Sequence, residues 1–188
     1  SNGEATQDAL INGLGLDDPV VGTAQALHSR VGGEMWSVVG SIKADATFDL
    51  GKTVDLTKVY VWNYNVADGT DIGMKDVEVL VSPDANLTNA NFTAIARITL
   101  KEGGDAAQAF NVVGTSVRLV KLKGISNWGH GWSVGLAEVR FESGDIAGEV
   151  PSVIIANPHE ADVIPFGTDV TFDTRVTDQD NNLLKVEF

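Results

Sequence analysis

Short runs of β-forming residues, separated by turn residues, recur along most of this chain and constrain its fold more than any other feature. The runs are rich in Val, Ile, Thr and aromatic residues, and their spacing is typical of a β-sandwich or barrel. In the clearest run, Val77, Val79 and Val81 share one face opposite Asp76 and Glu78, so that face of the strand is apolar. The pattern predicts an all-β domain with strands at Ala46–Leu50, Lys58–Tyr64, Lys75–Ser82, Thr93–Leu100, Gln108–Val113, Ser116–Lys123 and Leu136–Glu142.

The first 45 residues differ from this pattern, because glycines interrupt every apolar run. They predict long loops with short edge elements. A long loop region inside a compact domain is usually functional or held in place by something such as a metal ion.

The composition changes again near residue 143. The segment Ser143–Pro151 is small and polar and ends in proline, which is typical of a linker. Beyond it we expect strands at Ser152–Asn157, Asp169–Arg175 and Leu184–Phe188, which are too few for a stable sandwich. We therefore predict a first domain at 1–142, a linker at 143–151, and the N-terminal part of a second, truncated domain at 152–188.

Charge and composition argue against several functional classes. The 188 residues include 13 Lys+Arg and 26 Asp+Glu, a net charge of −13, whereas nucleic-acid binding needs basic residues to contact phosphates. No apolar run is long enough to span a membrane. The chain has no cysteine, which excludes disulfides, thiolate ligands and a Cys nucleophile. Its three scattered histidines form no recognisable catalytic motif, so we predict that it is not an enzyme.

Four motifs resemble the F5/8 type C, or discoidin-like, domains over roughly residues 5–142. They are Phe48-Asp49-Leu50-Gly51, Trp62-Asn63-Tyr64-Asn65, Val77-Glu78-Val79-Leu80-Val81-Ser82 and Gly135-Leu136-Ala137-Glu138-Val139-Arg140-Phe141. The resemblance implies an eight-stranded antiparallel jelly-roll β-sandwich of the galactose-binding-like type, with ligand loops at one end. Many bacterial members are carbohydrate-binding modules of family 32 type. The tail resembles the start of a bacterial Ig-like or cadherin-like module.

The resemblance also implies a structural calcium site. In the family, an Asp-Gly in the first loop and a Glu on the last strand hold the ion, and here Asn12-Gly13 and Glu138 occupy those places. Calcium binds several oxygen ligands at once. The implied ligands are the side chains of Asn12 and Glu138 and the carbonyls of Ala9, Leu14 and Ala137. Without the resemblance, a turn asparagine and a solvated strand glutamate explain the same residues.

Two segments could form a sugar-binding face, because aromatic rings stack on sugar C–H faces and planar polar groups bind hydroxyls. One is the strand end at 63–65, and the other is the glycine-flanked loop at 127–132. Loop aromatics can also cover the barrel mouth structurally, and mid-strand Trp62 is more typical of a core residue. Galactose-binding relatives use an Arg near Ile72, and here Lys75 is the nearby cation, which argues against simple galactose recognition. The candidate ligand-binding residues are His28, Trp36, Asn63, Tyr64, Asn65, Lys75, Asn127, Trp128, His130 and Trp132.

These observations predict a non-catalytic, carbohydrate-binding module that tethers a secreted multidomain bacterial enzyme or adhesin to a polysaccharide. We expect it to be a monomer within a multidomain chain. Two alternatives stay open, a discoidin-type protein or cell-surface adhesion domain and a ligand-free spacer. Exposed tryptophans beside free Asn63, Asn65 and His28 favour sugar, a flat exposed apolar patch favours protein, and buried rings favour the spacer.

Overall fold

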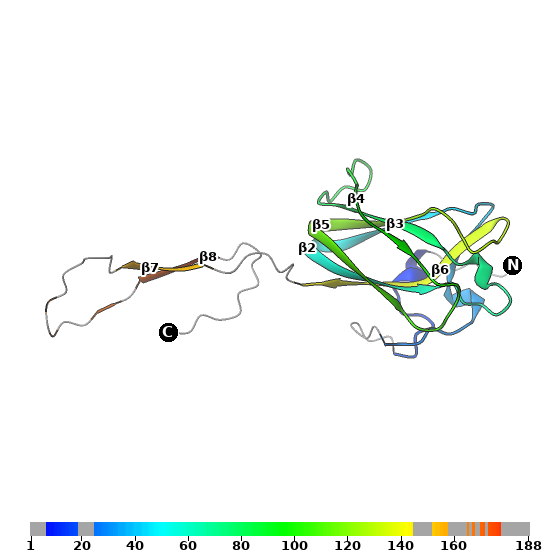
Figure 1. The fold of residues 1–188 in the computed structure, drawn as a ribbon, viewed down its shortest axis with the longest axis horizontal. Helices are drawn as coiled ribbons and strands as arrows, with labels where there is room; N and C mark the ends of the chain where they lie inside the picture. The colour runs from blue at the N-terminus through cyan, green and yellow to red at the C-terminus, as the bar shows by residue number, and fades with distance from the viewer. Residues whose placement is uncertain are drawn as a thin grey trace. The chain divides into compact units, whose positions relative to one another are not determined.

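The computed structural model in Figure 1 describes residues 7–18, 25–144, 152–157, 165, 167, 170–171 and 173–177. The chain forms two compact units, Ser1–Ile146 and Ala147–Phe188. The elements of the first unit are η1 (Gln7–Leu10), η2 (Gly32–Glu34), β1 (Trp36–Val39), β2 (Asp45–Asn63), η3 (Thr70–Ile72), β3 (Asp76–Ser82), β4 (Thr93–Thr99), β5 (Gln108–Gly124) and β6 (Ser133–Ser143). No helix in the described part of the chain is long and apolar enough to cross a membrane.

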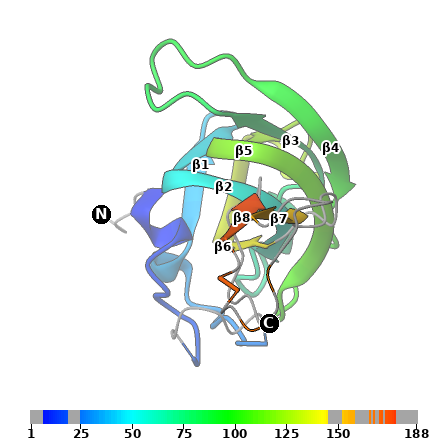
Figure 2. The same ribbon diagram turned by 90° about the vertical axis from the view of Figure 1, so that its left-hand side faces the viewer.

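The six strands of the first unit form one antiparallel sheet of order β1-β6-β2-β5-β3-β4, which curves around a common core (Figure 2). The strands β2 and β5 contribute to two layers. Residues 56–63 of β2 pair with β6, whereas residues 45–49 pair with the second half of β5, which in turn pairs with β3. Counting the halves of β2 and β5 separately, each layer has four strands, and the eight together form a β-sandwich.

The all-β prediction is confirmed, and the main difference lies in how the strands join. The pairs predicted at 46–50 and 58–64, and at 108–113 and 116–123, are each one continuous strand in the structure. Their turn residues remain inside the strands as irregularities, since the β2–β5 register shifts between Asp49 and Lys58, and Ser116 has a φ of 52°. Bulges of this kind let a strand bend from one layer to the next.

Two apolar clusters lie on opposite faces of β2. Val59 and Val61 point into the main core between the layers, together with residues such as Val79, Leu122 and Val139. The alternation of side chains along the strand places Trp62 on the other face, where it packs in a second cluster with Ala26 and Met35 from the N-terminal loops. These loops therefore cover the outer face of the layer near one end of the sandwich.

In the second unit, β7 (Ser152–Asn157) pairs with β8 (Asp173–Thr177) in antiparallel orientation. The structure places β7 at the predicted residues and begins β8 four residues later than the predicted Asp169. The predicted strand Leu184–Phe188 and most of the predicted linker lie outside the described residues. The Ig-like character of this unit and the proposed domain boundaries stay predictions.

Candidate functional site

A loop at 125–132, here called the tryptophan loop, is held against η3 by its backbone. The amide of Trp128 donates to the carbonyls of Asp71 (3.2 Å) and Gly73 (3.1 Å), and the amide of His130 donates to Asp71 (3.3 Å). The Asn127 side chain closes the loop from within: its Nδ2 donates to the carbonyls of His130 and Ser133, both at 2.8 Å. Its Oδ1 accepts from the Gly129 amide at 3.0 Å. Asn127, a predicted ligand residue, thus fixes the loop.

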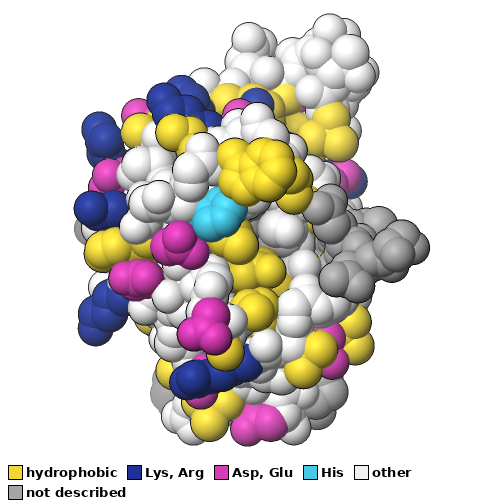
Figure 3. All heavy atoms as spheres, turned by 90° about the vertical axis from the view of Figure 1, so that its right-hand side faces the viewer, with side chains coloured by type: hydrophobic (Ala, Val, Ile, Leu, Met, Phe, Trp, Pro, Cys, Tyr) yellow, Lys and Arg dark blue, Asp and Glu magenta, His cyan; other side chains and the backbone are white. Residues whose placement is uncertain are grey.

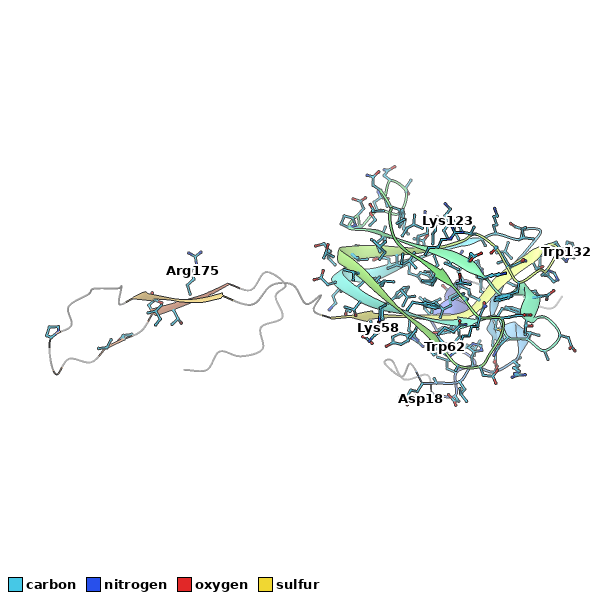
Figure 4. The ribbon with its side chains drawn as sticks, in the orientation of Figure 1. Asp18, Lys58, Trp62, Lys123, Trp132 and Arg175 are labelled. Atoms are coloured by element: carbon cyan, nitrogen blue, oxygen red, sulfur yellow. The ribbon has the colours of Figure 1, made fainter. Side chains whose placement is uncertain are left out.

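Trp132 is the exposed aromatic of this loop. Its side chain is 63% exposed, and Figure 4 shows it at the loop end of the first unit. The Gly40 amide donates to its carbonyl at 2.7 Å, and Val39 pairs with the next residue, Ser133. Two further apolar side chains of this region, Val39 (50% exposed) and Ile42 (43% exposed), are also in contact with solvent. The indole therefore protrudes from a backbone that is fixed on both sides.

Trp128 and His130 are half-buried beside it. The Nζ of Lys75 lies 4.7 Å from the centre of the Trp128 ring, which is a cation–π contact. The Trp128 Nε1 and the His130 Nδ1 are buried and have no hydrogen-bond partner within the described part of the chain. Figure 3, which views this end, shows a histidine beside a strip of hydrophobic side chains. The loop thus combines the exposed ring of Trp132 with a half-buried imidazole and a neighbouring ammonium group.

The strand-end amides predicted to bind a ligand are buried instead. Asn63 is fully buried, and its Nδ2 donates to the carbonyls of Met74 and Lys101, both at 2.8 Å. The Nδ2 of Asn65 donates to the His28 carbonyl (3.2 Å) and to the Asp105 carboxylate (3.1 Å). These amides donate to acceptors in the surrounding loops, because buried backbone carbonyls need donors.

The remaining candidates at this end are also interior residues. His28, Trp36 and Tyr64 are all buried, and Trp36 lies in the main core. The Nδ1 of His28 is 2.8 Å from the Ser29 carbonyl, while its Nε2 is buried without a partner among the described residues. The structure therefore brings the predicted residues to one end of the sandwich, but gives these three supporting positions rather than ligand-facing ones.

Sequence reasoning missed an ion pair at the edge of this end. The guanidinium of Arg30 donates to both carboxylate oxygens of Asp105, at 2.9 and 3.1 Å. This contact, above all, holds the pKa of Asp105 below its ordinary value, with a further hydrogen bond from Asn65. The two residues are 75 positions apart, so no local motif could have shown the pair.

The predicted calcium site centres on Glu138, which is fully buried. Its Oε1 accepts from the Gly13 amide (3.3 Å) and from the Arg140 guanidinium (2.9 Å), while its Oε2 has no partner among the described residues. Burial raises its pKa to about 7, although Arg140 and the Gly13 amide act in the opposite direction. An unpaired oxygen on a buried carboxylate fits a bound cation.

The other implied calcium ligands fit less directly. The Oδ1 of Asn12 accepts from the Leu14 amide at 2.8 Å in a local turn, so it would have to turn to reach an ion. Ala9 and Ala137 are buried, whereas the Leu14 side chain is half exposed. Within the described residues, no three His, Asp or Glu side chains gather as a metal site. Most of the ligands would therefore be backbone carbonyls.

The fold and the loop end define the first unit as a discoidin-like β-sandwich. The chain belongs to the Sad1/UNC-like C-terminal family, whose model matches residues 27–141. Both the resemblance predicted from the motifs and the jelly-roll fold class are confirmed. A search of curated proteins finds no match.

Solved structures share this fold at low sequence identity. The family 32 carbohydrate-binding module of Streptococcus pneumoniae EndoD is 11% identical with a TM-score of 0.50, and the alignment covers 77% of this chain and 89% of that one. The family 32 module of Clostridium perfringens NanJ, solved with galactose, is 15% identical (TM-score 0.49, 74% and 85% coverage). An F5/8 type C domain from Bacteroides fragilis is 16% identical (TM-score 0.48, 71% and 82% coverage).

Proposed function

We propose that the first unit is a non-catalytic carbohydrate-binding module that contacts its glycan through Trp132. The observation that carries this proposal is the 63% exposure of a large indole on a loop whose backbone is hydrogen-bonded on both sides. A planar aromatic surface is attractive to the C–H face of a sugar ring. Because the loop is already ordered, little conformational entropy is lost when a ligand binds.

The groups around Trp132 supply polar recognition. His130 lies two residues before it in the tryptophan loop, and the Lys75 ammonium contacts the ring of Trp128 in the same loop. Sugar hydroxyls can both donate and accept, so they match such mixed groups. The fold is shared with the EndoD carbohydrate-binding module, which supports the proposal, but a fold alone does not assign a function.

The same proposal includes a tethering role and a structural calcium ion. A module of this kind raises the effective concentration of a polysaccharide around an attached enzyme or adhesin, and we propose that the parent protein is secreted by a bacterium or displayed on its surface. Glu138 would hold calcium with loop carbonyls, and the ion would neutralise its buried carboxylate and fix the N-terminal loops. None of this requires a catalytic group.

The proposal is tested by retention of the 188-residue chain on a panel of immobilised plant, algal and animal polysaccharides. We expect retention on at least one polysaccharide, and at least about tenfold weaker binding by Trp132→Ala. Leu87→Ala is the matched control, because Leu87 is another exposed apolar side chain (54%) but lies between β3 and β4. Equal retention of both variants would contradict a site at Trp132.

A protein-adhesion role is the second candidate, favoured by one observation. Exposed Val39 and Ile42 add apolar surface in the same region as Trp132, and exposed apolar patches are typical of protein interfaces. Sugar stacking predicts that the double variant Val39→Ser, Ile42→Ser keeps polysaccharide retention. Absence of retention on every polysaccharide by a folded wild-type chain would favour adhesion instead.

A further inference from the structure

Two glycines at the loop end do not have the positive φ that would require glycine. Gly32 lies in η2 and has no positive φ, and Gly69 has a φ of −147°. A Cβ at Gly32 would lie 3.5 Å from Val66 Cγ2, and one at Gly69 would lie 3.7 Å from Ile72 Cδ1, which are ordinary contact distances. A side chain could therefore be accommodated at either position.

Neighbouring glycines show the contrast. A Cβ at Gly73 would lie 2.8 Å from the Asn63 Oδ1, and one at Gly135 would lie 2.5 Å from the Trp36 carbonyl oxygen. Packing thus explains Gly73 and Gly135 but leaves Gly32 and Gly69 unexplained. The missing side chains keep the surface over Tyr64 and Val66 low, since a Cβ at either glycine would lie within 4 Å of both residues.

The low surface between Gly32 and Gly69, here called the glycine strip, includes the half-buried side chains of Val66 and Ile72. At one end it meets the tryptophan loop, because Asp71 of η3 accepts the amides of that loop. At the other end, η2 begins two residues after Arg30, whose guanidinium is bound to Asp105.

The charges beside the glycine strip select against anionic ligands. Arg30 is neutralised by Asp105, and Lys75 is held over an aromatic ring. Asp68 and Asp71 form no ion pair with another described residue. Lys75 keeps its positive charge over the Trp128 ring, so these two carboxylates outnumber it, and a uronate or sulfate group would meet a surface of net like charge, which is unfavourable at an interface.

We propose that this end binds a run of at least two consecutive neutral sugar residues, lying along the glycine strip between Trp132 and Arg30. This inference rests on the proposed function and adds the length and charge class of the ligand. One sugar ring stacks on Trp132, and the next covers Val66 and Ile72 with its C–H face. The Arg30–Asp105 pair then contacts hydroxyls at the far end.

The test is calorimetric titration of the 188-residue chain with neutral gluco-, manno-, xylo- and galacto-oligosaccharides of one to four residues. In at least one series, we expect the trisaccharide to bind at least about tenfold more tightly than the monosaccharide. Gly32→Leu should abolish this gain and leave monosaccharide binding unchanged. Gly33→Leu is the matched control, since a Cβ at Gly33 meets nothing within 4 Å. If Gly32→Leu melts at a lower temperature than the wild type, Arg30→Gln takes its place and should also reduce the gain.

Three results would overturn the inference. Equal affinity for monosaccharide and trisaccharide, or full trisaccharide affinity in both Gly32→Leu and Arg30→Gln, contradicts the glycine strip as a subsite. In either case, if Trp132→Ala still abolishes polysaccharide retention, the proposed function stands and only the glycine-strip subsite is rejected. Absence of binding to every oligosaccharide and polysaccharide contradicts the proposed function as well.

Discussion

The tryptophan loop and the layer under the N-terminal loops contain the same residue types but use them in opposite ways. Trp132 is 63% exposed, whereas Trp62 is fully buried and its Nε1 donates to the Ala26 carbonyl at 2.8 Å. Asn127 fixes a loop at the surface, and Asn63 bridges two loop carbonyls in the interior. The comparison teaches that a tryptophan or asparagine near a ligand loop is available for binding only when it has no packing or backbone partner to satisfy.

The largest expected effect is on the buried side of this comparison. Trp62→Ala should lower the free energy of unfolding by about 3–5 kcal/mol, because it removes a fully buried ring and its hydrogen bond to the Ala26 carbonyl. Urea denaturation measures the change. Trp62→Phe keeps most of the packing and should lose less. A loss below about 1 kcal/mol for Trp62→Ala would show that the N-terminal loops are not held by this residue.

A second prediction concerns the pH dependence of stability through Glu138. Burial raises its pKa to about 7 in the folded state, above the ordinary value, so the folded state binds a proton that the unfolded state has already released. Stability is therefore full at low pH and falls as pH rises toward and through 7, by up to about 3 kcal/mol. Thermal melting from pH 5 to pH 8 in EDTA measures this fall.

Two comparisons sharpen that prediction. Glu138→Gln should melt at nearly the same temperature across this range, because it has no proton to lose. Calcium should reduce the fall in the wild type, since a bound cation stabilises the ionised carboxylate. A wild-type melting temperature that is independent of pH in EDTA would show that Glu138 is not responsible, and no effect of calcium would contradict the metal proposal alone.

The sequence predicted the strands well, because alternation along Val77, Val79 and Val81 follows directly from a half-buried sheet. It did not predict that β2 and β5 are continuous, since turn-like residues such as Gly51 can be retained inside a bulged strand. The sequence placed Trp132 on a glycine-flanked loop as a candidate ligand residue but left open whether its ring is exposed or covers the barrel mouth; the structure shows it 63% exposed.

The sequence could not predict which polar residues would be buried. Asn63 donates to Lys101, 38 positions away, and Asn65 donates to His28, 37 positions away. Partners of this kind depend on how distant loops meet, and no local pattern encodes them. The Arg30–Asp105 pair escaped prediction for the same reason. Polar residues that hydrogen-bond to the backbone of long loops therefore cannot be told from ligand-binding residues until the fold is known.

The smallest expected effect on stability is at Trp132, and it tests the comparison most directly. Trp132→Ala should change the free energy of unfolding by less than about 0.5 kcal/mol, because an exposed side chain loses little packing. Trp132→Tyr should be equally stable and should retain part of the glycan binding through its ring. A loss of more than about 1 kcal/mol in urea denaturation of Trp132→Ala would mean that the indole supports the loop. Lost binding would then reflect a displaced loop rather than a missing sugar contact, and the contrast with Trp62 would disappear.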